Sequence, residues 1–153
     1  MRALVAALAR PGDEARVLDY AFWAGDFVNP DLDGEARLAA GWRPDVVVAK
    51  SIGCLVAAAA CADHGLAPRA CVLIGAPVNR LLAEARGDLL ARHAARAPTL
   101  FIQQAEDPTG SLAELARLVP GQAVREASGA DHLYADIPEL VGLIEAWPGW
   151  PSD

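Results

Sequence analysis

Three side chains that together can perform nucleophilic catalysis follow strand-like segments of this sequence. Ser51 lies in the run Ala49-Lys50-Ser51-Ile52-Gly53, Asp107 follows an apolar strand-like run, and His132 ends the loop Gly129-Ala130-Asp131-His132. In such a cluster the hydroxyl attacks, the imidazole takes its proton and the carboxylate orients the imidazole. The sequence therefore predicts Ser51 as nucleophile, His132 as general base and Asp107 as the orienting acid.

The residues around Ser51 are those of a sharp turn between a strand and a helix. The usual pattern at such a nucleophile is Gly-x-Ser-x-Gly; here Ala49 takes the first glycine position and Gly53 keeps the second. Small side chains let the turn close, and the N-terminus of the following helix favours an oxyanion, with the N–H of Ile52 as one donor. The alternative is that Ser51 is an ordinary helix N-cap.

Asp107 and His132 also have plainer interpretations, as a solvated turn acid before a proline and as a surface loop histidine. Glu106 is the alternative acid, whereas Asp131 is expected to be a loop residue because neighbouring side chains diverge. The chain order Ser, Asp, His matches one class of triad, and the number of predicted strand–helix units between the three residues fits it. The combination favours the catalytic interpretation.

The elements that must position these residues alternate between strand and helix. Strands are predicted at 15–20, 45–49, 70–75, 99–103 and 122–126, and helices at 3–10, 35–40, 53–64, 79–95, 111–119 and 138–147, with Gly87 as a candidate break in the segment 79–95. The central strands are apolar without alternation, as expected of strands covered on both faces. The sequence predicts an α/β fold, three-layer α/β/α with a mostly parallel sheet of about five strands, in one domain over residues 1–153. The carboxyl ends of parallel strands share one edge, so Ser51, Asp107 and His132 are expected to meet there.

The stretch from about residue 15 onward resembles the α/β-hydrolase superfamily, on the Ala-Lys-Ser-Ile-Gly turn, the strand ending in Glu106-Asp107 and the Gly-x-Asp-His segment at 129–132. The resemblance implies a minimal serine hydrolase that acts on a small ester-like acyl substrate and needs no cofactor. Members usually carry an early His-Gly loop that supplies the second oxyanion N–H, and no such loop precedes Ser51. A backbone N–H near Trp23 is expected to take that role, and Phe22 and Trp23 either line an acyl pocket or cover the sheet.

Composition excludes several other classes. The net charge of −7 argues against nucleic acid, and no apolar run reaches the roughly 18 residues of a membrane span, so we expect a cytoplasmic protein. The three cysteines are expected to be small buried hydrophobes, because no Cys-x-x-Cys pattern and only three histidines are present, and no metal site is predicted. His64 and His93 are expected on solvated helix surfaces.

The sequence leaves two alternative functions open and also suggests a homodimer. The first rival is a catalytically weak or inactive homologue that serves as a binding or interaction protein. The second is a doubly wound ligand-binding domain for a phosphorylated ligand, which the absence of a glycine-rich phosphate loop disfavours. Lys50 is expected to have a structural or pKa-tuning role rather than to form a Ser–Lys dyad. An exposed first edge strand favours a homodimer.

Overall fold

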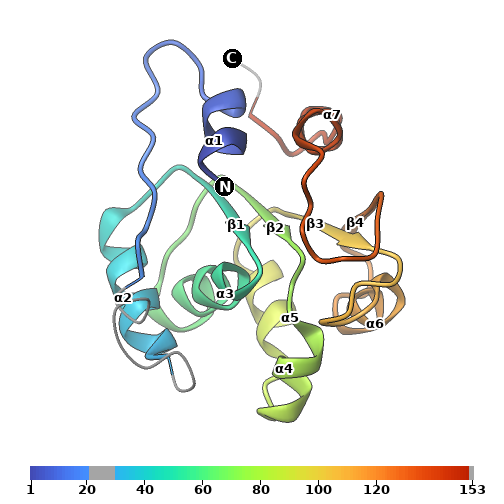
Figure 1. Ribbon diagram of the computed structural model, residues 1–153. Coiled ribbons are helices and arrows are strands. Elements are labelled where there is room, and N and C mark those ends of the chain that lie inside the picture. Colours follow the sequence, from blue (N-terminus) through green and yellow to red (C-terminus); the bar gives the residue numbers. More distant parts are fainter. Residues whose placement is uncertain (21–29, 152–153) are drawn as a thin grey trace.

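A computed structural model describes residues 1–20 and 30–151 of the chain. In this part four strands form one sheet in the order β1-β2-β3-β4, and all neighbouring pairs are parallel. The strands are β1 (Val46–Lys50), β2 (Ala70–Ile74), β3 (Thr99–Gln104) and β4 (Ala123–Ala127). The predicted α/β fold with a parallel sheet flanked by helices is therefore confirmed (Figure 1).

Helices cover both faces of the sheet (Figure 1). One face carries α1 (Arg2–Leu8) and α7 (Ile137–Glu145), and the other carries α2 (Leu32–Trp42), α3 (Ile52–His64), α4 (Val78–Ala83), α5 (Leu89–Ala94) and α6 (Leu112–Leu118). Successive strand residues point to opposite faces, so Val72 packs with α1 and α7 while Leu73 packs with the other helices. Because both faces are covered, β2 and β3 are buried along their whole length, which explains the unbroken apolar sequence of β2 and of residues Leu100–Ile102 in β3.

Local sequence signals set several helix ends. Ser111 caps α6, accepting a hydrogen bond from the backbone N–H of Glu114, whose side chain in turn accepts from the N–H of Ser111. The long helix predicted at 79–95 is divided into α4 and α5, with Gly87 between them. Near the end of the chain Trp147 is buried against the core that contains α7.

Two predictions about single elements are wrong. The strand predicted at 15–20 does not form, since residues 13–20 belong to no strand of the sheet. Leu18 and Tyr20 instead pack against the core beside α3. A β-like composition produces a strand only where a neighbouring strand accepts its hydrogen bonds. His93, expected on a solvated helix surface, is fully buried on the inner side of α5.

The ladder leaves β1 and β4 as the edge strands of the described sheet. Side chains of Val46, Val47 and Val48 are half-buried on β1. The homodimer expected from an exposed edge stays a prediction. No helix in residues 1–20 or 30–151 is long and apolar enough to cross a membrane.

Candidate active site

The turn that carries Ser51 joins β1 directly to α3. Ser51 has φ +54° and ψ −124°, a conformation that residues with a side chain rarely adopt. Its backbone N–H donates to the carbonyl of Ile74 at 2.9 Å, and its own carbonyl accepts from the N–H of Cys54 at 2.8 Å. These bonds at the end of the parallel ladder hold the strained turn, which projects the Ser51 hydroxyl beyond the sheet edge.

The Ser51 side chain does not cap α3. Its Oγ lies 2.8 Å from Nε2 of His132 instead. The alternative interpretation of Ser51 as an ordinary N-cap therefore disagrees with the structure.

Small residues flank the turn for two identifiable reasons. A Cβ atom added at Gly53 would lie 2.7 Å from the hydroxyl oxygen of Tyr20 and 3.8 Å from the Cβ of Ala49. The first distance is too short for an ordinary contact, so a side chain at position 53 would displace the Tyr20 hydroxyl. The second shows that positions 49 and 53 face each other across the turn, which explains why both are small.

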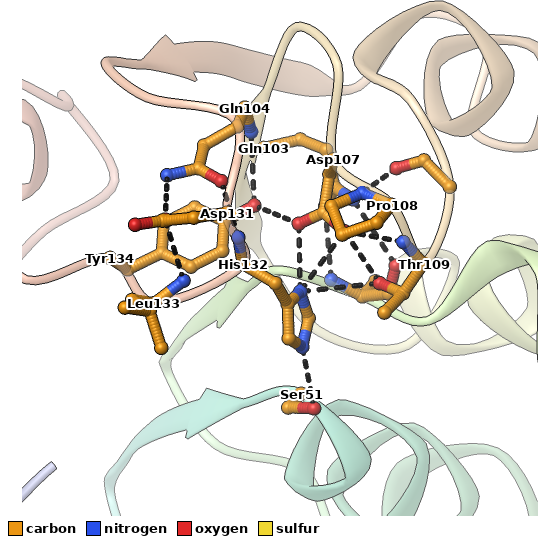
Figure 2. A network of polar contacts seen from close by, with 12 residues as sticks. Ser51, Gln103, Gln104, Asp107, Pro108, Thr109, Asp131, His132, Leu133 and Tyr134 are labelled. Carbon is orange, nitrogen blue, oxygen red and sulfur yellow. Dashed lines mark hydrogen bonds and ion pairs between the residues drawn. The ribbon is translucent and has the colours of Figure 1, made fainter.

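The structure brings Asp107 and His132 to Ser51 from two different loops (Figure 2). Nδ1 of His132 lies 2.8 Å from Oδ2 and 3.0 Å from Oδ1 of Asp107. The Asp107 side chain is fully buried, whereas 18% of the His132 side chain remains exposed. Because the carboxylate faces Nδ1, that nitrogen carries the proton and Nε2 presents its lone pair to the Ser51 hydroxyl.

Asp107 accepts hydrogen bonds from three residues. Besides His132, it accepts from the Tyr134 hydroxyl at 2.7 Å and from Thr109, whose backbone N–H and hydroxyl donate at 2.8 and 2.7 Å. Burial alone would raise the pKa of Asp107, but these hydrogen bonds outweigh burial and lower it. Asp107 is therefore held as a carboxylate. Glu106, the alternative acid, is exposed to solvent.

Tyr134 and Gln104 are functional candidates that sequence reasoning missed. The Tyr134 hydroxyl accepts from the backbone N–H of Gln104 at 2.9 Å while it donates to Asp107. Burial, followed by the hydrogen bond to Asp107, raises the pKa of Tyr134. The phenol therefore stays protonated and remains a donor. Its position two residues after His132 is the one signal that could have pointed to it.

The Gln104 side chain holds the loop that carries His132. Its Oε1 accepts from the backbone N–H of His132 at 2.8 Å, and its Nε2 donates to the carbonyl of Ser128 at 3.0 Å and to Asp131 at 3.2 Å. His132 and Tyr134 both have positive φ, +64° and +53°. Side-chain-bearing residues seldom take this conformation, so the contacts of Gln104 and Tyr134 compensate for a strained loop. As expected, Asp131 is a loop residue, and it accepts from the N–H of Leu133.

The end of β2 lies directly against the two aromatic rings of the site. Gly75 has φ +62°, and a Cβ added there would lie 2.6 Å from the Tyr134 ring and 3.1 Å from Cε1 of His132. The neighbouring Ala76 exchanges hydrogen bonds with the buried side chain of Gln103. The loop after β2 is thereby fixed against β3, and the His132 ring packs against Gly75 at the start of this loop.

The residues predicted to supply oxyanion donors and an acyl pocket lie only partly within the described part of the chain. Ile52 is the first residue of α3, so its N–H has no carbonyl one turn earlier in that helix to bond. Phe22 and Trp23, predicted for the pocket and the second oxyanion N–H, lie outside the described residues. Lys50 places its ammonium 5.9 Å from the centre of the Tyr134 ring.

A hydroxyl, an imidazole and a buried carboxylate in one hydrogen-bonded line can generate a nucleophile at neutral pH. Comparisons with known proteins add no assignment to this geometry. A scan against protein-family models and searches of curated proteins and of solved structures found no match to the chain.

Proposed function

We propose that this protein is a serine hydrolase that cleaves a small acyl ester through a covalent intermediate on Ser51. The observation that carries the proposal is the continuous line from Ser51 Oγ through His132 to the buried Asp107, with contacts of 2.8 Å on both sides of the imidazole. The proposal includes membership of the α/β-hydrolase superfamily, which the parallel sheet and the Ser-Asp-His order support.

The chemistry follows from the protonation states. Nε2 of His132 accepts the hydroxyl proton as Ser51 Oγ attacks the ester carbonyl, and Asp107 stabilises the imidazolium that forms. The imidazolium then gives its proton to the leaving alkoxide, so that the C–O bond breaks and an acyl-serine remains. Water, deprotonated by the same imidazole, attacks the acyl group and releases the acid and the free serine.

The start of α3 supports stabilisation of the tetrahedral intermediate. The N–H of Ile52 follows the nucleophile, where an oxyanion donor is needed, and the thirteen-residue helix adds its positive end. A second donor is proposed near Trp23. Loss of one such donor typically lowers kcat by about 10²- to 10³-fold.

Two surface pockets of the structure lie away from these residues. One is lined by Arg10, Trp147 and Trp150 among others, and the second by residues of α2 and α4 with Pro30, Asp31 and Arg86. Neither includes Ser51, Asp107 or His132. The proposed substrate is a small acyl group that reaches Ser51 at the carboxyl edge of the sheet.

A fluorophosphonate probe tests the proposal directly. The unmodified protein should become covalently labelled on one residue, identified as Ser51 by peptide mass spectrometry, and Ser51→Ala should not be labelled. Ser111→Ala is the matched control, because Ser111 caps α6 and touches no residue of the triad. Equal labelling of the unmodified protein and Ser51→Ala would refute the proposal. Labelling without turnover of any small ester would favour an inactive homologue that binds a partner.

A further inference from the structure

A second cluster of reactive side chains lies in the core, near the end of the sheet opposite Ser51. Cys61 comes from the last turn of α3, Cys71 from the second position of β2 and His93 from α5. All three residues are fully buried. The two sulfur atoms and a ring nitrogen of His93 all lie within 4.8 Å of one another. Three different elements thus bring two thiols and an imidazole together.

The hydrogen bonds of Thr99 determine which nitrogen of His93 carries the proton. The Thr99 hydroxyl donates its single hydrogen to the carbonyl of Ala97 at 2.8 Å. Nε2 of His93 lies 3.0 Å from the Thr99 hydroxyl oxygen. Nε2 must therefore be the donor, which leaves Nδ1 of the neutral ring with its lone pair. This Nδ1 is buried and has no hydrogen-bond partner among the described residues. A buried polar atom without a partner destabilises the folded protein, and a bound cation would remove that penalty.

The third cysteine shows what an ordinary buried thiol does in this fold. Cys54 lies in the first turn of α3, and its Sγ is 3.3 Å from the carbonyl of Ile74 and 3.6 Å from that of Ala49. Both contacts are to backbone oxygens, and no other titratable side chain is part of them. Cys61 and Cys71 differ because they share their surroundings with the imidazole of His93.

We propose that Cys61, Cys71 and His93 bind one thiophilic d¹⁰ cation, with Zn²⁺ as the physiological ion. Two thiolates and a neutral imidazole balance the charge of Zn²⁺, so the complex can be buried without a net charge. Binding releases the two thiol protons to solvent. The chain supplies three ligands, so water would take the fourth tetrahedral position. With Zn–S near 2.3 Å and Zn–N near 2.0 Å, neighbouring ligand atoms are then about 3.4–3.8 Å apart. The three ligand atoms lie within 4.8 Å of one another, so they must move closer together to reach that spacing when the ion binds.

Thr99 has a defined part in this site. A histidine that binds a metal through one nitrogen usually donates its other N–H to a fixed acceptor, which sets the tautomer and the ring orientation. Thr99 provides that acceptor for Nε2. The cation would tie α3, β2 and α5 together on one face of the sheet and therefore act on stability. The proposed ester hydrolysis is independent of it, because its three residues lie at the opposite sheet edge.

Cobalt titration of the reduced, chelator-treated protein tests the site. Co²⁺ should saturate at one ion per chain with a thiolate-to-cobalt charge-transfer band in the near ultraviolet, and Zn²⁺ should displace it. Zn²⁺ should also raise Tm, because a ligand that binds only the folded state stabilises it. Cys71→Val and His93→Leu, which fill the same space with apolar atoms, should lose the band and the rise in Tm, whereas Cys54→Ala should keep both.

The titration of the unmodified protein decides the matter even if a variant fails to fold. Absence of the charge-transfer band in folded protein would overturn the proposal and leave a thiol–imidazole cluster of the core. A band that Cys54→Ala also loses would overturn it as well. Fluorophosphonate labelling of Ser51 in the same samples reports the hydrolase proposal separately, since neither result depends on the other.

Discussion

The hydroxyl of Tyr134 and the imidazole of His132 bind the same oxygen of Asp107. Tyr134 donates to Oδ2 at 2.7 Å, and Nδ1 of His132 lies 2.8 Å from that oxygen. Two groups thus hold one carboxylate oxygen, and one of them, the Tyr134 hydroxyl, stays protonated because its pKa is raised. The orientation of the imidazole toward Ser51 depends on this shared contact and on Gln104, which fixes the backbone of His132.

Asp107→Asn tests the role of the carboxylate. The amide cannot accept the Nδ1 proton in the same way and favours the wrong imidazole tautomer, so we expect kcat for a small ester to fall on the order of 10³- to 10⁴-fold with little change in KM. Steady-state kinetics measure this. Glu106→Gln is the matched control, since that side chain is exposed and should leave kcat unchanged. A larger loss of kcat in Glu106→Gln than in Asp107→Asn would show that Asp107 is not the orienting acid.

Tyr134→Phe removes one hydrogen bond to Asp107 and leaves the backbone N–H of Gln104 without its acceptor. We expect the free energy of unfolding to fall by about 1–3 kcal/mol. We also expect kcat to fall about 3- to 30-fold, because the orienting carboxylate is held less firmly. Urea denaturation and ester kinetics check the two effects. An unchanged kcat would show that Thr109 and His132 suffice to hold Asp107.

Gln104→Glu places a second carboxylate beside Asp131 and removes the donor to Ser128. Like charges at this distance repel, so the loop that carries His132 should shift and kcat should fall at least about tenfold. The double variant Gln104→Glu/Asp131→Asn removes the repulsion and should recover part of the loss. If the double variant is no better than the single one, repulsion by Asp131 is not the cause.

Gly75→Ala introduces a Cβ 2.6 Å from the Tyr134 ring at a residue with φ +62°. We expect a loss of about 1–3 kcal/mol of stability, and a lower kcat because His132 rests on the same residue. Gly142→Ala is the control. Gly142 lies within α7 with open space around its Cβ position, so alanine there should stabilise by about 0.5–1 kcal/mol. Thermal unfolding and kinetics on both variants distinguish a local clash from a general effect of alanine.

The pH dependence of stability reports the charge of Asp107. Burial would raise its pKa, but hydrogen bonds from His132, Tyr134 and Thr109 lower it in the folded protein. A lowered folded pKa stabilises the protein at pH values above the unfolded pKa, and this contribution is lost as the pH falls through the folded value. Between about pH 5 and pH 2, the unmodified protein should therefore lose more stability than Asp107→Asn. Urea denaturation over that range measures both slopes, and equal slopes would contradict the lowered pKa.

Signals between neighbouring residues are enough to predict the local features of this chain. The β-branched run before Ser51 and the small residues around it specify a strand, a tight turn and a helix, because these signals act between neighbours in the chain. The apolar sequence of β2 and of residues 100–102 in β3 predicted a covered parallel sheet, and a parallel sheet brings the ends of its strands to one edge. The sequence could therefore predict that Ser51, Asp107 and His132 meet at one edge of the sheet.

Which side chains from different parts of the chain meet depends on how the elements pack. The segment at 15–20 has strand-like composition but no partner strand in the described sheet. His93 has the sequence context of a surface helix, yet the packing of α5 on α3 buries it beside Cys61 and Cys71. Tyr134 and Gln104 reach the triad through long-range hydrogen bonds that no local pattern encodes. Burial and pairing depend on the sum of many contacts between elements, and that sum is absent from any short stretch of sequence.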